Sequence, residues 1–190
     1  MAKAQQTATL GFRAKTGRAI AVALSGSRDQ PRFLLRREVD LKDAEVPETA
    51  EPYHSVLELP WSRATVVVKD LVTVIERRAS EVFAELRDEL QSKGFALTAA
   101  GVVGSPDRSL EKIGNPHIRA HAAEGMTFRQ VLEFAAAQHA IPCRSFSDRT
   151  IGISASAVDR VLKSLGQSAG APWRLDEKAA ATAAWILLAK

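Results

Sequence analysis

The feature that most constrains the fold is a long amphipathic repeat between Ser62 and Lys93. Its apolar side chains recur every three or four residues, which is the spacing of one face of an α-helix. Gly94 follows at a position where helices commonly end. The repeat therefore predicts one long helix whose apolar stripe must be covered by a sheet or by another helix. The residues of the stripe are Val68, Leu71, Val72, Ile75, Ala79, Val82, Phe83, Leu86 and Leu90.

The segments before this helix predict an antiparallel meander. Three runs have the composition of strands, and a short turn over residues 14–17 joins the first two in a pattern typical of a hairpin. The strands are expected at 7–13, 18–24 and 32–40. Residues 42–61 then hold three prolines among several acids, which indicates a proline-rich loop.

The segments after the helix alternate between strand and helix. Residues 95–103 form an apolar run bounded by glycines, which is typical of a strand buried on both faces. Further elements are expected as a short helix within 113–125, a helix at 128–139, a strand at 141–146, and helices at 156–165 and 176–189. With the opening meander, this order predicts a single α/β domain over residues 1–190, built as a mixed sheet with helices on both faces.

The composition is that of an ordinary globular protein. Hydrophobic residues make up 46% of the chain and charged residues 25%. There is no apolar run long enough to cross a bilayer, and no signal-peptide pattern opens the chain. Because a single cysteine, Cys143, cannot form an internal disulfide, we expect a cytoplasmic protein without membrane attachment.

Basic residues gather near the start of the chain. The whole sequence has 26 Lys and Arg against 22 Asp and Glu, yet within residues 1–37 only Asp29 opposes the basic side chains. These are Lys3, Arg13, Lys15, Arg18, Arg28, Arg32, Arg36 and Arg37. A basic hairpin of this kind can contact phosphates. The alternative is that these side chains are solvated and discourage edge-to-edge strand pairing.

The run 113–125 concentrates polar chemistry in one predicted short helix. Asn115 suits its N-cap, and the final glycine suits its end. His117, His121 and Glu124 follow one another at i, i+4 and i+7, so they share one helix face. Two imidazoles at this spacing can bind one metal ion, with the carboxylate as a third ligand. The alternative is that the histidines form hydrogen bonds with the neighbouring loop and the end of the sheet.

Four other residues each allow two interpretations. Arg119 can clamp a phosphate or a carboxylate, or it can pair with a nearby acid. Ser105 follows the 95–103 strand, at an end where open α/β sheets bind ligands, although a plain turn also explains it. Asp176 and Glu177 begin the last helix, where Asp176 can cap it and Glu177 can interact with its dipole; the alternative is that they bind a metal.

The order of elements, together with two local segments, resembles the ribonuclease H-like fold in its RuvC-type or actin-like branch. The opening hairpin of those proteins is similar to residues 10–24, LGFRAKTGRAIAVAL. Their acidic, alanine-rich final helix resembles residues 176–185, DEKAAATAAW. The run 113–125 also resembles a bacterial family that supplies no activity.

This resemblance implies a nuclease site from which the sequence departs. RuvC-type nucleases hold two divalent cations between acids on the first strand, the fourth strand and the last helix. Here Arg13 falls at the first-strand position, residues 99–103 carry no acid, and Asp107 lies beyond them in a loop. Only Asp176 and Glu177 match. Because an arginine repels a cation, we expect no divalent metal at the family's usual site.

Two functional hypotheses follow. The first is a ribonuclease H-like module with a degenerate nuclease site that binds an anionic ligand, nucleic acid or nucleotide, with help from the histidines of 113–125. Its ligand-binding residues would be Arg13, Lys15, Ser105, Asn115 and Arg119. The alternative is a metal-dependent phosphoester hydrolase with the catalytic residues His117, His121, Glu124 and Asp176. A third hypothesis is a structural protein that forms a homodimer through an exposed helix face.

Overall fold

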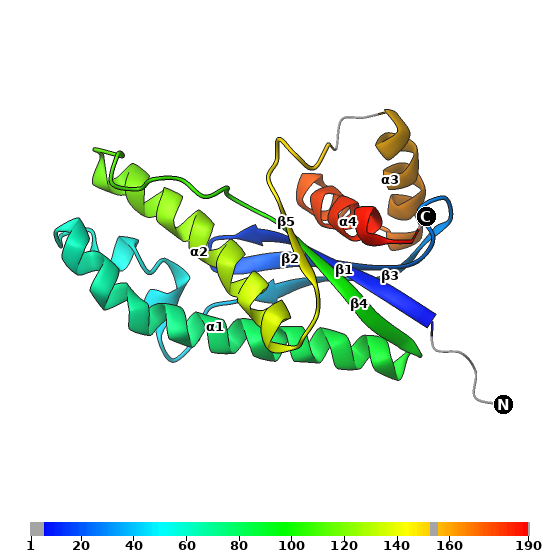
Figure 1. Ribbon diagram of the computed structural model, residues 1–190, viewed down its shortest axis with the longest axis horizontal. Helices are drawn as coiled ribbons and strands as arrows, with labels where there is room; N and C mark the ends of the chain where they lie inside the picture. The colour runs from blue at the N-terminus through cyan, green and yellow to red at the C-terminus, as the bar shows by residue number, and fades with distance from the viewer. Residues whose placement is uncertain (1–5, 153–155, 190) are drawn as a thin grey trace.

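Five strands form one mixed sheet at the centre of the molecule (Figure 1). The computed structural model describes residues 6–152 and 156–189. The strand order is β3-β2-β1-β4-β5, in which β1, β2 and β3 are antiparallel neighbours and β4 runs parallel to both β1 and β5. The strands are β1 (Gln6–Lys15), β2 (Arg18–Gly26), β3 (Pro31–Asp40), β4 (Phe95–Val103) and β5 (Cys143–Phe146). The predicted meander and mixed sheet are confirmed.

Helices cover both faces of this sheet, as expected (Figure 1). The first two pack on one face and the last two on the other. They are α1 (Trp61–Ser92), α2 (Pro116–Gln138), α3 (Ser156–Ala169) and α4 (Leu175–Leu187). Among the described residues, none of these helices combines the length and the hydrophobicity that crossing a membrane requires.

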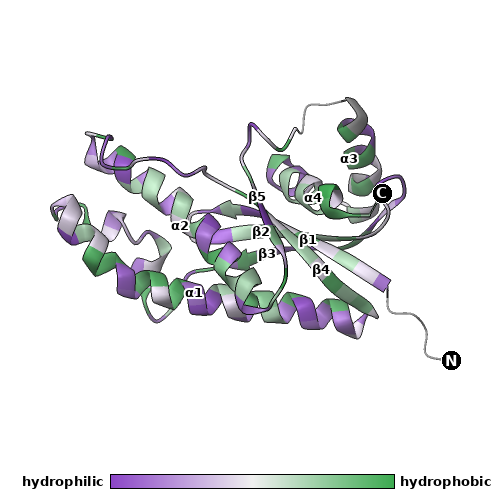
Figure 2. Ribbon diagram, viewed as in Figure 1, coloured by the Kyte–Doolittle hydropathy of each residue, from purple (hydrophilic) through white to green (hydrophobic). Residues whose placement is uncertain are grey.

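The long amphipathic helix is present within one residue of its predicted bounds. Figure 2 shows hydrophilic and hydrophobic positions side by side along α1, whereas β4 is hydrophobic nearly throughout. The apolar stripe of α1 supplies Ile75, Phe83 and Leu86 to the core that it shares with the sheet. The ring of Phe83 lies 6.0 Å from that of Phe12 in β1, measured between centroids. Burial of this stripe is what holds α1 against the sheet.

The alternation of side chains along β1 explains why two layers form. One set faces the core beneath α1 and α2, and it consists of Ala8, Leu10, Phe12 and Ala14. The residues between them face α4 instead, since Oγ1 of Thr9 donates a 2.8 Å hydrogen bond to the carbonyl oxygen of Ala184. Arg13 continues this second set, because successive side chains of a strand point to opposite faces. The chain's strand parity thus places Arg13 on the α4 side.

α4 packs directly on β1 because both elements present small residues. A Cβ atom at Gly11 would lie 1.9 Å from the carbonyl oxygen of Ala180 and 2.7 Å from the nitrogen of Ala184. Only a glycine allows the helix backbone to come this close to the strand. The alanines of α4 are buried at the same contact. This approach brings the N-terminal turn of α4, which carries Asp176, beside the end of β1.

The expectation of two helices between 113 and 139 is wrong, because α2 is continuous from Pro116 to Gln138. Gly125 lies inside the helix, and its missing side chain makes room for the β4–α2 loop. A Cβ atom there would lie 2.4 Å from Oγ of Ser105. The glycine therefore serves a close contact and does not end a helix. In the same way, α3 runs through Gly166, where the ring of Trp173 occupies the space of a side chain.

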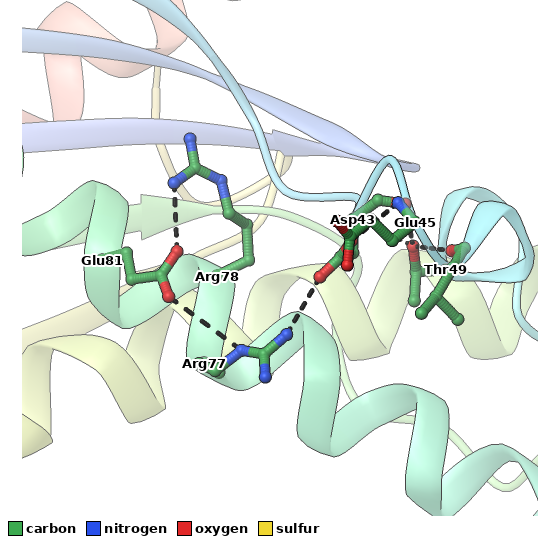
Figure 3. Close-up of polar contacts among 7 residues, drawn as sticks. Asp43, Glu45, Thr49, Arg77, Arg78 and Glu81 are labelled. Carbon is green, nitrogen blue, oxygen red and sulfur yellow. Dashed lines mark hydrogen bonds and ion pairs between the residues drawn. The ribbon is translucent and has the colours of Figure 1, made fainter.

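The predicted proline-rich loop contains two short 3₁₀ helices, η1 (Pro47–Ala50) and η2 (His54–Val56). It is fastened to α1 by an ion pair of 2.9 Å between Arg77 and Asp43, and Oγ1 of Thr49 accepts a hydrogen bond from the backbone N–H of Asp43 (Figure 3). Figure 1 shows the N-terminal parts of α1 and α2 extending together past the sheet, with this loop beside them. The loop is therefore placed to contribute residues to the start of α2.

Candidate functional site

A cluster of charged side chains lies where β1 ends beneath the N-terminus of α4. The guanidinium of Arg13 holds the carboxylate of Asp148 in a fork, with hydrogen bonds of 2.6 Å and 3.2 Å. Its Nε atom lies 3.4 Å from Oδ1 of Asp176, which is also 3.2 Å from Nζ of Lys15. Two cations and two carboxylates thus balance one another at this end of the sheet.

The four charges of this cluster differ in their exposure. The Arg13 side chain is 14% exposed and the Asp148 side chain 68%, so the pair is reached from solvent on the Asp148 side. Asp148 follows β5 in the loop that leads to α3. The neighbouring acid of α4, Glu177, is buried and accepts a 2.8 Å hydrogen bond from the backbone N–H of Arg174. Glu177 therefore caps α4. The prediction that Asp176 is the cap is wrong, because α4 begins at Leu175 and Asp176 lies inside its first turn.

Several other basic residues of the opening meander bind backbone carbonyls or acids within the fold. Arg28 donates to the carbonyl oxygens of Ile186 and Leu188 at the end of α4, and Arg37 pairs with Glu89 of α1. Arg36 donates to the carbonyl oxygens of residues 170–172. Lys3 lies outside the described residues. Much of the basic excess thus stabilises tertiary contacts, as Arg28, Arg36 and Arg37 show.

A second cluster lies at the start of α2, where His54 of η2 meets His117 and His121. The ring centroid of His54 is 4.8 Å from that of His117 and 4.3 Å from that of His121. Nε2 of His117 and Nε2 of His121 are 3.1 Å apart. One ligand atom from each of the three rings lies within 4.8 Å of the other two. Three imidazole nitrogens therefore converge, and they are a donor set that can bind a metal ion.

Glu124 lies beneath this cluster and contacts only one of its rings. Its side chain is fully buried, and Oε1 accepts a 2.8 Å hydrogen bond from Nδ1 of His54. The same oxygen accepts hydrogen bonds of 3.1 Å from the backbone N–H groups of Tyr53 and His54. Glu124 therefore orients His54, and the converging donor atoms come from the three histidines alone. In the structure, the carboxylate predicted as a possible third metal ligand is thus a hydrogen-bond partner of His54.

Aromatic stacking supports the segment that carries His54. The ring of Tyr53 stacks on that of Trp61 at 5.5 Å between centroids, and the guanidinium carbon of Arg119 lies 5.2 Å from the centroid of the Trp61 ring. Burial of the Tyr53 phenol raises its pKa above the ordinary value; a hydrogen bond with Thr127 opposes this rise, and the charge of Glu124 adds to it. The phenol therefore stays neutral at physiological pH and acts as a packing group.

The remaining predicted site residues form hydrogen bonds between α2 and the loop that precedes it. The side chain of Asn115 caps the helix by accepting a 3.0 Å hydrogen bond from the backbone N–H of Ile118. Nε of Arg119 donates a 2.8 Å hydrogen bond to the carbonyl oxygen of Ile113. The carbonyl oxygen of Ser105 accepts a 2.8 Å hydrogen bond from Nε of Arg129, a buried arginine to which the sequence analysis had assigned no role.

The structure does not bring the predicted ligand-binding residues into one site. Arg13, Lys15 and Asp176 lie on the face of the sheet covered by α4, whereas His117 and His121 lie on α2, which covers the opposite face. Two residues that the sequence did not single out complete the two clusters. They are Asp148 beside Arg13, and His54 beside the other two histidines.

Comparison with known proteins gives a match in architecture. No protein-family model and no curated protein sequence matches the chain. RuvC of Thermus thermophilus, in complex with a Holliday junction substrate, superposes with a TM-score of 0.54 at 13% identity, covering 94% of this chain and 90% of that one. A second Thermus thermophilus RuvC structure gives 0.49 at 12% identity, covering 94% and 92%. The Aquifex aeolicus Ppx/GppA phosphatase gives 0.40 at 12% identity, covering 84% and 41%. On the first of these matches, the chain has the ribonuclease H-like fold.

Proposed function

We propose that this protein is a ribonuclease H-like module that binds nucleic acid through phosphate contacts at the Arg13 end of the sheet. The observation that carries the proposal is the forked, partly exposed contact between Arg13 and Asp148 in a fold shared with a Holliday-junction-bound RuvC. A guanidinium that already holds a carboxylate in a fork has the geometry that binds a phosphate in the same way.

The same cluster argues against cleavage by two metal ions at this place. Two-metal catalysis needs carboxylates free to bind cations that stabilise the attacking and leaving oxygens. Asp176 is instead 3.2 Å from the ammonium of Lys15 and 3.4 Å from the guanidinium of Arg13. A divalent cation would have to displace both positive groups or share the carboxylate with them. We therefore infer binding without cleavage at this end of the sheet.

Asp148 has the properties of a side chain that a phosphate can replace. It is 68% exposed and stands in a loop, whereas its partner Arg13 is 14% exposed and fixed in β1. A phosphate that replaces the carboxylate keeps the largely buried guanidinium paired with an anion, so the exchange leaves no uncompensated buried charge. In the proposed complex a backbone phosphate takes the position of the Asp148 carboxylate on the guanidinium, and Lys15 adds a second positive charge.

The proposal is tested by fluorescence anisotropy of the full chain with a labelled four-way DNA junction, a linear duplex and a single strand. We expect binding that weakens as salt is raised, because phosphate contacts release counterions. Each sample is then run on a denaturing gel after incubation with Mg²⁺ or Mn²⁺, and the strands should remain intact. Absence of binding up to about 100 μM at low salt would contradict the proposal. Cleavage that is lost in Asp176→Asn would contradict the inference of binding without cleavage.

A further inference from the structure

The three histidines converge on a point that lies apart from the proposed phosphate contacts. His117 and His121 are one helical turn apart on α2, and His54 reaches them from η2. We propose that these three side chains bind a divalent transition-metal ion of the Zn²⁺ class. Imidazole nitrogens suit zinc and its neighbours, whereas Mg²⁺ and Ca²⁺ prefer oxygen donors.

The separation of the donor atoms fits such an ion. A zinc–nitrogen bond of about 2.0–2.1 Å in tetrahedral geometry requires nitrogens roughly 3.3–3.4 Å apart. Nε2 of His117 and Nε2 of His121 are 3.1 Å apart, and the third donor is within 4.8 Å of both. To close the set around one ion, the side chains of His117 and His121 must rotate, and both are exposed.

The hydrogen bond from His54 to Glu124 prepares the third donor. Because a carboxylate oxygen only accepts, Nδ1 of a neutral His54 must carry the proton, which leaves the lone pair on Nε2. That Nε2 atom is buried, and it has no hydrogen-bond partner among the described residues. A metal-binding histidine characteristically donates its other ring N–H to a carboxylate in this way. Glu124 is thus a positioning residue for the proposed ligand.

The site leaves one coordination position open. Three protein ligands and a solvent-facing fourth position are the arrangement in which zinc binds a water molecule. His117 and His121 are exposed, so this fourth position faces solvent and not the core. Occupation of the site would also join the 42–61 loop to the start of α2, since His54 belongs to the loop and the other two ligands to the helix.

The metal proposal does not depend on the proposed function. The histidines belong to η2 and the start of α2, whereas Arg13 belongs to β1 on the side covered by α4, and no described side chain belongs to both clusters. Arg13→Gln should therefore leave metal binding unchanged, and His117→Ala should leave DNA binding unchanged. Failure of one proposal can be told from failure of the other by these two variants.

The test is a Zn²⁺ titration of the full, chelator-stripped chain in competition with a chromophoric chelator. The chain has four histidines, so His139→Gln is a matched control outside the cluster. We expect one Zn²⁺ per chain in the wild type and in His139→Gln. His117→Ala and His121→Ala should each weaken binding by more than the roughly 10- to 100-fold typical of a lost supporting contact. Both residues are exposed, so neither change should prevent folding. Equal affinity in wild type and cluster variants, or no binding in any of them, would overturn the proposal.

Glu124→Gln tests the positioning role, because it removes the charge and keeps the size. Zinc affinity should fall by roughly 10- to 100-fold, while all three ligands remain. Co²⁺ is then added in place of zinc, and the visible spectrum of each protein is recorded. We expect ligand-field bands of a low-coordinate ion in the wild type and their loss in His54→Ala. Unchanged zinc affinity in Glu124→Gln would contradict the role of this residue, and bands retained in His54→Ala would exclude His54 as a ligand.

Discussion

Replacement of Gly11 by alanine tests the contact that positions α4, and with it Asp176. The new Cβ atom would lie 1.9 Å from the carbonyl oxygen of Ala180, whereas ordinary van der Waals contact begins at 3.4 Å. The helix must therefore retreat by about 1.5 Å, because backbone atoms cannot rotate away as a side chain can. Overpacking of a core typically costs 1–3 kcal/mol, and a clash with backbone belongs at the upper end. We expect Gly11→Ala to lower the free energy of unfolding by about 3 kcal/mol.

The assay is thermal unfolding followed by circular dichroism. For a chain of this length, about 3 kcal/mol corresponds to a fall in Tm of roughly 6–12 °C. Gly114→Ala is the matched control, because a Cβ atom there would meet nothing within 4 Å. That variant should stay within about 0.5 kcal/mol of the wild type. A Tm for Gly11→Ala within about 2 °C of the wild type would refute the direct packing of α4 on β1.

Two further predictions concern α2 and the single cysteine. Gly125→Ala places a Cβ atom 2.4 Å from Oγ of Ser105 and 3.2 Å from its Cβ, a clash of about 1–3 kcal/mol. Because alanine is favoured over glycine inside a helix by about 1 kcal/mol, chemical denaturation should show a net loss of about 0–2 kcal/mol, and a net gain in stability would count against this contact. Cys143 is exposed as a residue, but its sulfur is desolvated. This desolvation, together with the charge of Glu133, raises the thiol pKa from 9.0 to about 12. At pH 8 this thiol should react with an aromatic disulfide roughly 30- to 60-fold more slowly than an ordinary thiol. The reason is that its much smaller thiolate fraction outweighs the greater nucleophilicity of each thiolate. Reaction at the ordinary rate would show that the sulfur is solvated.

Periodic patterns in the sequence were sufficient to predict most of the architecture. The three- to four-residue spacing of α1, and the strand-like composition of β1 and β2 on either side of a short turn, are local signals, and each is strong enough to specify its element. Gly125 misled the prediction because a glycine at the end of a helix and a glycine under a loop look the same in sequence. Only the position of Ser105 distinguishes them.

The sites could be predicted only in part, because each is completed by a residue from a distant segment. His117 and His121 are visible as a helical pair, but no spacing connects them with His54, which precedes α1. In the same way, Arg13 stands out because RuvC-type nucleases have an acid at this strand position. Asp148, in contrast, lies in a loop that no sequence pattern links to β1. Strand parity predicts that Arg13 and Phe12 point to opposite faces of the sheet, but it does not tell which helices cover each face.

The most direct test of the proposed phosphate contact is the direction in which two substitutions in one ion pair change the affinity for DNA. Affinity for the DNA junction is measured by anisotropy over a range of salt concentrations for Arg13→Gln and Asp148→Asn. The first should weaken binding roughly tenfold and reduce the salt slope by about one, because one phosphate contact is lost. The second should tighten binding, because it removes the carboxylate that competes for the guanidinium. If both substitutions weaken binding, or neither changes it, the pair is structural and the proposed phosphate contact is wrong.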